Sequence, residues 1–380
     1  MRRKRHGVLG TVAVLAAAAL AAGACASTST KVAYSPEVLM ETMRERVPEA
    51  AAGELVVPFQ VSPEMVEKAR KVTATARSDY EKTQALVRSI TDAHAFALSY
   101  EPVATAPPAE TVARGYGNCL ALTSIFVGLA RQLGLTAYYV DASDRVNDLR
   151  REEELIVDAG HIAGVARTER GFTLVDYDGQ VADYRTFRII DDVTALAHYY
   201  NNLGYELIDE AQKEGRPIPW EEVRRNFELA TMVVPRFARA HNNLGVVYAR
   251  LKKPQRAEAE YWAAITSDGN FAAPHHNLGN LSLDRGDLDE ALAEYDKALS
   301  LRRRNPFLHY HRGVALYRRG DLAAAAAAFK RAISLKHDYI EPRNLLAQVY
   351  DQQGRHEEAA KIRSAVRLLT ESRRTSRRRP

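Results

Sequence analysis

The sequence predicts an α+β domain followed by an all-α solenoid of helical repeats. Three observations in the 380 residues support this fold class. A cysteine at position 119 opens a long apolar stretch with helical spacing, and runs rich in β-branched and aromatic residues follow that stretch. From about Ala238 the chain repeats with a period of 34 residues, as stacked helical pairs do. We therefore expect two consecutive domains of different structural class.

Residues 1–24 have the composition of an export signal. Basic residues at positions 2–5 precede an alanine-rich apolar run, which ends in small residues before Cys25. Residues 20–25 resemble a bacterial lipoprotein signal, which implies cleavage before Cys25 and lipid on its thiol. An uncleaved anchor is the alternative, since about 18 apolar residues are the lower limit for crossing a bilayer. We favour the lipoprotein signal and expect a lipidated tether at 25–36, facing the periplasm from a membrane, which is the outer membrane in a Gram-negative source.

Net charge argues against a nucleic-acid partner. The whole chain carries a formal charge of +5, and removal of four basic residues with the signal leaves about +1. Five arginines crowd the last eight residues, so the rest of the mature chain carries about −4 and offers no basic patch. We expect residues 372–380 to form a solvated, disordered basic tail, and contact with anionic lipid or cell wall is the alternative.

Helices are expected early in the mature chain. Apolar residues recur with helical spacing in residues 37–52 and 63–94, and Asp79 can cap a second helix inside the longer stretch. Residues 55–61 are expected to form a strand, and a proline-rich stretch then leads to the cysteine. We expect residues 37–195 to make up the first domain.

The segment around Cys119 predicts a helix that begins with a cysteine. Gly115 and Gly117 interrupt the preceding chain. Asn118 suits the N-cap position, and Gly134 suits the stop. Cys119 then lies in the first turn, where free backbone N–H groups and the helix dipole favour a thiolate. The alternative is a small apolar side chain that is simply buried. If the other cysteine carries lipid, no disulfide is possible within the monomer.

Extended runs after this helix predict an antiparallel hairpin. Residues 136–140 are β-branched and aromatic, and two further runs, 155–165 and 172–178, flank a polar turn. If the turn centres on Glu169 and Arg170, His161 lies opposite Asp178 and diagonal to Asp176. All three then share one face of the hairpin, because side chains alternate along a strand.

The order of these residues resembles the transglutaminase-like superfamily, the papain-related cysteine enzymes, over about residues 60–185. Its members carry a glycine-x-cysteine at a helix start and then a histidine and an aspartate on strands. The matching residues are Gly117, Cys119, His161 and Asp176. The resemblance implies a catalytic triad in which His161 holds the thiolate and Asp176 orients the imidazole. Asn118 and the backbone N–H of Cys119 are candidate oxyanion donors. The alternative is a core histidine and a turn-capping aspartate that share no role.

No metal or cofactor is expected. One cysteine and one histidine fall short of a zinc ligand set. Further histidines, at positions 275, 276, 309 and 311, belong to the repeats, and we expect them at the surface of the repeat helices.

The 34-residue period resembles tetratricopeptide (TPR) repeats. Small and aromatic residues recur in register, and residues 244–248 reproduce the family's Leu-Gly-x-x-Tyr motif. The clearest units are 238–271, 272–305, 306–339 and 340–371. We expect a diverged repeat to begin near Tyr199, with a linker helix at 199–202, so that the solenoid covers 199–371. Its concave face is expected to hold a protein or peptide partner.

Together these features predict an exported lipoprotein enzyme with a repeat solenoid attached. The expected reaction is acyl transfer at peptide or amide bonds, as in a cysteine peptidase or a transglutaminase, because both pass through an acyl-enzyme. The rival class is a non-catalytic envelope scaffold or assembly lipoprotein that acts through its repeats. Turnover that depends on Cys119 separates the two classes.

Overall fold

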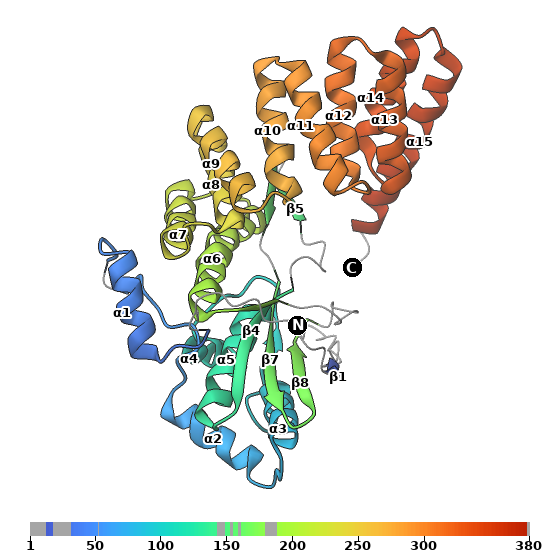
Figure 1. Cartoon of the computed structure of the whole chain (residues 1–380). Helices are drawn as coiled ribbons and strands as arrows, with labels where there is room; N and C mark the ends of the chain where they lie inside the picture. The colour runs from blue at the N-terminus through green and yellow to red at the C-terminus, as the bar shows by residue number, and fades with distance from the viewer. Residues whose placement is uncertain are drawn as a thin grey trace. The chain divides into compact units, whose positions relative to one another are not determined.

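The structure, a computed structural model, describes residues 13–17, 32–51, 53–142, 149–152, 155–158, 161–178 and 188–377 (Figure 1). The expected lipidation site, Cys25, lies outside these residues. The chain forms two compact units: Met1–Arg150 with Asp158–Ala240, and Arg151–Val157 with His241–Pro380. Within the described ranges, no helix combines the length and the apolar character that crossing a bilayer requires.

Three helices with serine caps precede the buried helix of the first unit: α1 (Pro36–Arg46), α2 (Pro63–Thr73) and α3 (Asp79–Thr91). In each, the hydroxyl of the capping serine accepts a hydrogen bond from a backbone N–H of the first turn. The helical stretches expected from the sequence are thereby confirmed, except that Ser78 and not Asp79 caps α3. The strand expected at 55–61 is wrong. The backbone there makes a turn, closed by the Gln60 N–H and the Val57 carbonyl, because Pro58 has no N–H for a strand ladder.

A tight turn leads into the buried helix. The elements are β2 (Ser99–Tyr100), α4 (Pro108–Arg114), β3 (Tyr116–Gly117) and α5 (Cys119–Gln132). Gly115 ends α4 with a φ of +78°, a conformation that favours glycine. Gly117 is packed so closely that a Cβ atom there would lie 2.8 Å from the Thr111 side chain. The chain therefore reaches Cys119 along a backbone path that larger residues at these two positions would disturb.

An antiparallel sheet packs beside α5 (Figure 1). In the described part of the chain its spatial order is β1 (Ala13–Ala17), β8 (Gly171–Asp176), β7 (Ile162–Thr168), β4 (Thr136–Asp141) and β9 (Arg188–Ile190). β7 and β8 form the expected hairpin, and Thr168 lies opposite Gly171, so the turn centres on Glu169 and Arg170 as predicted. The extended run expected at 155–165 is divided instead. β6 (Leu155–Asp158) pairs with β5 (Leu149–Glu152) in a separate two-stranded sheet.

β1 lies inside the predicted export signal. It pairs antiparallel with β8, and Ala13 lies opposite Asp176. A chain processed before Cys25 lacks β1, and β8 then forms one edge of its sheet. The hairpin of β7 and β8 is common to both forms of the chain.

Close packing at Gly164 of β7 holds α5 against the sheet. A Cβ atom at Gly164 would lie 2.9 Å from the Phe126 ring of α5. One strand further, the Tyr139 hydroxyl of β4 donates a hydrogen bond to the Ser124 hydroxyl at 3.0 Å. Both contacts are buried, so they fix the position of the N-terminal half of α5 relative to the hairpin.

The first unit ends with a helical pair, α6 (Asp192–Glu214) and α7 (Trp220–Val233). A Cβ atom at Gly204 would lie 2.7 Å from the Phe227 ring, so the two helices approach as a repeat pair does. We expected this pair to begin near Tyr199 and to belong to the solenoid. In the structure α6 begins earlier, at Asp192, and both helices lie in the first compact unit, because Leu196 and Tyr200 belong to the same hydrophobic core as α5.

The solenoid consists of antiparallel helical pairs. Its helices are α8 (Ala238–Arg250), α9 (Pro254–Ser267), α10 (Ala272–Arg285), α11 (Leu288–Leu301), α12 (Pro306–Arg319), α13 (Leu322–Leu335), α14 (Ile340–Gln352) and α15 (His356–Arg377). Three pairs share one contact: a glycine on the first helix meets an aromatic ring on the second, at Gly245–Tyr261, Gly279–Tyr295 and Gly313–Phe329. α15 continues into the expected disordered tail as far as Arg377, because that stretch lacks proline and glycine and arginine is a good helix former.

Candidate active site

Cys119 is the first residue of α5, as the sequence predicts. The Asn118 side chain caps the helix, and its Oδ1 atom accepts a hydrogen bond from the Ala121 N–H at 2.9 Å. The thiol is free and nearly enclosed, with 7% of the residue exposed. The N–H groups at a helix start have no partner within the helix, so the thiol lies where a negative charge is stabilised.

The hairpin brings His161 and Asp176 together. Nε2 of His161 lies 3.1 Å from Oδ1 of Asp176, and both side chains are almost completely buried, at 2% and 0% exposure. The other ring nitrogen, Nδ1, lies 3.9 Å from Oδ2 of Asp178, which is too far for a hydrogen bond. The Asp178 N–H donates to Oδ1 of Asp176 at 3.2 Å and so helps to hold that carboxylate in place.

His161, which directly precedes β7, also interacts with Cys119 of α5. Burial lowers the pKa of His161, but the negative charge of a Cys119 thiolate, together with the hydrogen bonds that the ring donates to Asp176 and Cys119, raises this pKa to about 11. A Cys119 thiolate therefore favours the charged imidazolium form of His161 beside it. This is the charge state that a cysteine nucleophile needs.

The Asn118 amide donates its hydrogen bonds to groups within the protein, so it is not placed to bind an oxyanion. Its Nδ2 atom donates to the Thr105 hydroxyl at 2.6 Å and to Oε1 of Glu206 at 3.3 Å. Both amide hydrogens are therefore engaged while Oδ1 caps the helix. Of the two oxyanion donors expected from the sequence, the backbone N–H of Cys119 is the one that this geometry leaves available.

Sequence reasoning missed Glu206 and Thr105. Both are buried, and Oε1 of Glu206 also accepts a hydrogen bond from the Thr105 N–H. Glu206 is 88 positions from Asn118, so no local pattern relates them. The one sequence signal for a buried role of Glu206 is its position as a glutamate on the apolar face of a predicted helix.

The repeat histidines are buried rather than exposed, which corrects the expectation for three of them. His276 and His311 are packed between neighbouring repeats, where their rings stack and Nε2 of His276 lies 2.5 Å from Nδ1 of His311. His275 is buried beside Glu294. Within the described residues, no group of three or more histidine, cysteine or acidic side chains is placed to hold a metal ion.

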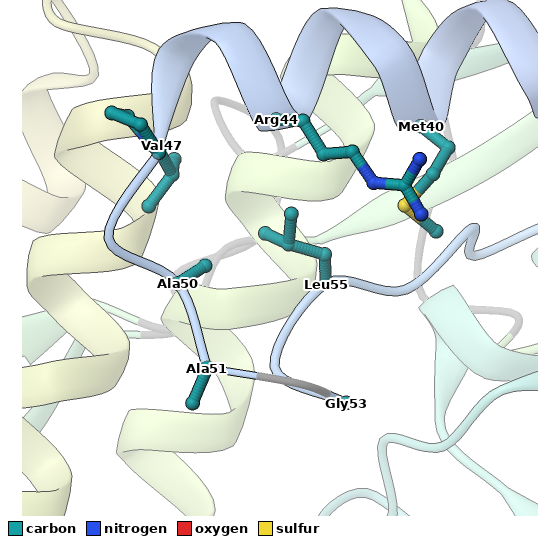
Figure 2. Close-up of a pocket in the computed structure, with 8 residues that line it drawn as sticks. Met40, Arg44, Val47, Ala50, Ala51, Gly53 and Leu55 are labelled. Carbon is teal, nitrogen blue, oxygen red and sulfur yellow. The ribbon is translucent and has the colours of Figure 1, made fainter.

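A small pocket lies elsewhere in the first unit (Figure 2). It has a volume of about 210 Å³ and lies between α1 and the chain that follows it, with Met40, Arg44, Val47 and Leu55 among its lining residues. None of the predicted site residues lines it. It therefore plays no part in the site around Cys119.

Comparison with known families identifies both parts of the chain. A model of the transglutaminase-like superfamily matches residues 66–162, which include Cys119 and His161 but end before Asp176. Models of TPR repeats match residues 220–271, 279–320 and 315–354. The chain thus contains a transglutaminase-like domain followed by TPR repeats.

Three similar proteins each match less than half of this chain. A curated relative, "Uncharacterized protein ycf37" of Pyropia yezoensis, is 28% identical over 136 residues, which are 35% of this chain and 68% of that protein. A solved structure of MamA from Desulfovibrio magneticus RS-1 is 19% identical and covers 46% of this chain and 96% of its own, with a TM-score of 0.40. The structure of pilF from Pseudomonas aeruginosa is 18% identical and covers 47% and 78%, with a TM-score of 0.43.

Proposed function

We propose that the first unit is a papain-like cysteine acyl-transfer enzyme that acts on peptide or amide bonds. The observation that carries the proposal is the buried hydrogen bond between His161 and Asp176 beside Cys119. A thiol at a helix start, an imidazole and a carboxylate that orients the imidazole are the three parts of a cysteine triad. Their chain order is that of the transglutaminase-like superfamily, whose model covers the first two of them.

In this mechanism, the Cys119 sulfur attacks the carbonyl carbon of the substrate amide. The carbon becomes tetrahedral, and its oxyanion accepts a hydrogen bond from the Cys119 N–H. His161, as imidazolium, then donates its proton to the nitrogen of the leaving amine, the C–N bond breaks, and a thioester remains on Cys119. Asp176 keeps Nε2 of His161 engaged, so that Nδ1 is the nitrogen that exchanges protons.

The second half of the reaction decides between hydrolysis and transamidation. Neutral His161 removes a proton from the acceptor, which attacks the thioester carbon and releases the Cys119 thiolate. Water as the acceptor gives a carboxylic acid, and a primary amine gives a new amide. The same three residues serve either acceptor.

We further propose that the mature protein is a lipoprotein that begins at Cys25 and faces the periplasm, anchored by lipid. The basic start, the alanine-rich run and the small residues before Cys25 support this assignment. Under it, the enzyme remains at a membrane surface, which is the outer membrane in a Gram-negative source, while the TPR repeats select partners.

A second candidate function is that of an envelope scaffold. TPR repeats generally mediate protein–protein interactions, and models of these repeats match residues 241–271 and 279–354 of the second unit. In a scaffold, the concave face of the solenoid holds a protein or peptide, and the cysteine domain carries no turnover.

Labelling of the full chain with iodoacetamide near neutral pH tests the proposal. Peptide mass spectrometry locates the label, and the rate constant at Cys119 is compared between the wild type and His161→Ala. The enzyme proposal predicts that the wild-type rate constant is at least about tenfold higher than that of His161→Ala, because His161 stabilises the reactive thiolate. Equal rates would leave the scaffold as the function of this chain.

A further inference from the structure

Glu206 is a buried acidic residue that the mechanism above does not use. It lies on α6 in the same compact unit as Cys119, and only 8% of the residue is exposed. A carboxyl in such a place costs free energy unless hydrogen bonds compensate for the lost water. Its hydrogen-bond partners therefore indicate what it does.

Those partners belong to the chain that leads into α5. Oε1 of Glu206 accepts hydrogen bonds from the Thr105 N–H at 2.5 Å and from Nδ2 of Asn118 at 3.3 Å. The Thr105 hydroxyl accepts a second bond from Nδ2 of Asn118 at 2.6 Å. Glu206, Thr105 and Asn118 thus form a closed, buried cluster of hydrogen bonds around the residue that directly precedes Cys119.

This cluster determines which way the Asn118 amide points. With Nδ2 directed at two acceptors, Oδ1 must face the Ala121 N–H, where it caps α5. A flipped amide would set its N–H groups against the Ala121 N–H and its oxygen against Glu206 and Thr105. The carboxyl on α6 therefore secures the cap of the helix that carries the nucleophile.

We propose that Glu206 is a positioning residue for the nucleophile, which acts through Asn118 to hold the first turn of α5 and so keeps Cys119 within reach of His161. The inference rests on the proposed cysteine chemistry of the same site. A small displacement of the thiol weakens its contact with the imidazole, and displacements on the order of 1 Å can lower rates about a hundredfold. Glu206 touches neither substrate nor sulfur in this role.

Four variants of the full chain, in addition to His161→Ala, test this role through the rate of Cys119 alkylation by iodoacetamide near neutral pH. Glu206→Ala removes the acceptor, and we expect its rate to fall about tenfold or more. Glu206→Gln keeps an acceptor oxygen, and we expect a rate within about threefold of the wild type. Glu210→Gln, on the exposed surface of the same helix, is the matched control and should leave the rate unchanged. Asn118→Ser retains a helix cap but cannot reach Glu206, and it should lose as much rate as Glu206→Ala.

A pH profile distinguishes positioning from general damage. At strongly alkaline pH the thiolate forms without help from His161, so the Glu206→Ala rate should approach that of the wild type. The double variant with Asn118→Ser should show no further loss, because both changes break one link. If Glu206→Ala does not fold, the Asn118→Ser rate decides: a fall supports the role, and a wild-type rate overturns it.

The alkylation rates distinguish failure of the proposed cysteine chemistry from failure of the positioning role alone. If the wild type reacts no faster than His161→Ala, the cysteine chemistry fails and the positioning role fails with it. If the wild type reacts faster than His161→Ala while Glu206→Ala keeps the wild-type rate, the positioning role alone is overturned. A loss in Glu206→Gln as large as that in Glu206→Ala also contradicts it.

Discussion

Nε2 of His161 lies 3.1 Å from Oδ1 of Asp176, whereas Nδ1 of the same ring lies 3.9 Å from Oδ2 of Asp178. Strand alternation predicts one face for both carboxylates, so it alone does not distinguish them. The first distance is that of a hydrogen bond and the second is not. Asp176 is therefore the residue that can fix the orientation and tautomer of the imidazole.

Replacement of the two aspartates should have unequal effects on the reactivity of Cys119. Asp176→Asn is expected to lower the rate of iodoacetamide alkylation near neutral pH by about tenfold or more, because a neutral amide no longer holds the imidazolium in place. Asp178→Asn is the matched control, two positions further along the chain, and should change the rate by less than about threefold. Equal losses in the two variants would contradict the assignment of Asp176.

The free energy of unfolding should depend on the protonation of Glu206. Burial, with a smaller contribution from the negative charge of Glu210, raises the pKa of Glu206 to about 7. Hydrogen bonds from Thr105 and the positive charge of Arg114 oppose this rise. The folded chain then binds more protons than the unfolded chain between about pH 4.5 and about pH 7, so stability falls as the pH rises through this window. The loss is expected to reach up to about 3 kcal/mol.

Glu206→Gln removes this titration. Denaturant unfolding at several pH values should show that the stability difference between Glu206→Gln and the wild type grows in favour of the variant across the same window. Glu214→Gln, whose side chain is exposed on the same helix, should follow the wild type. A wild-type profile that runs parallel to that of Glu206→Gln would show that Glu206 does not titrate as described.

The contact between glycine and an aromatic ring should limit what the repeats tolerate. A Cβ atom at Gly279 would lie 2.6 Å from the buried Tyr295 ring, so Gly279→Ala forces the paired helices apart. We expect a net loss of about 1–3 kcal/mol, despite the better helix propensity of alanine. At Gly269 the nearest atom would lie 4.0 Å from a Cβ, and Gly269→Ala should change stability by less than about 0.5 kcal/mol. Thermal unfolding of both variants tests the difference, and equal shifts would count against the packing account.

Cys25 should be the lipid-bearing N-terminus of the mature chain. Mass spectrometry of protein from the membrane fraction should find a chain that begins at Cys25 with an added lipid mass. Cys25→Ser should keep the unprocessed N-terminus and lose the lipid. A membrane-bound wild-type chain that retains residues 1–24 would overturn this assignment.

Much of the site could be predicted because its signals are local. Asn118 and Gly134 bound the helix, and the short turn at Glu169 and Arg170 sets the register that places His161 and Asp176 on one face. Each of these inferences uses residues within one or two elements of each other.

The remaining features depend on contacts between distant parts of the chain. Glu206 meets Asn118 across 88 positions, which no periodicity reveals. The sequence predicts too late a start for α6, because Leu196 and Tyr200 belong to a repeat-like helical pair and also pack into the core of the first unit. His276 and His311 are buried between neighbouring repeats, in an interface that exists only after the solenoid has stacked.

The pH dependence of Cys119 alkylation tests the central claim most directly. The rate constant for iodoacetamide at Cys119 is measured from about pH 5 to about pH 10 in the wild type and in His161→Ala, with the label located by mass spectrometry. If Cys119, His161 and Asp176 form one unit, the wild-type rate is already near its plateau at neutral pH, and His161→Ala shifts the rise to about pH 8.5, as for an ordinary thiol. Wild-type and His161→Ala curves that coincide, both rising near about pH 8.5, would contradict the account.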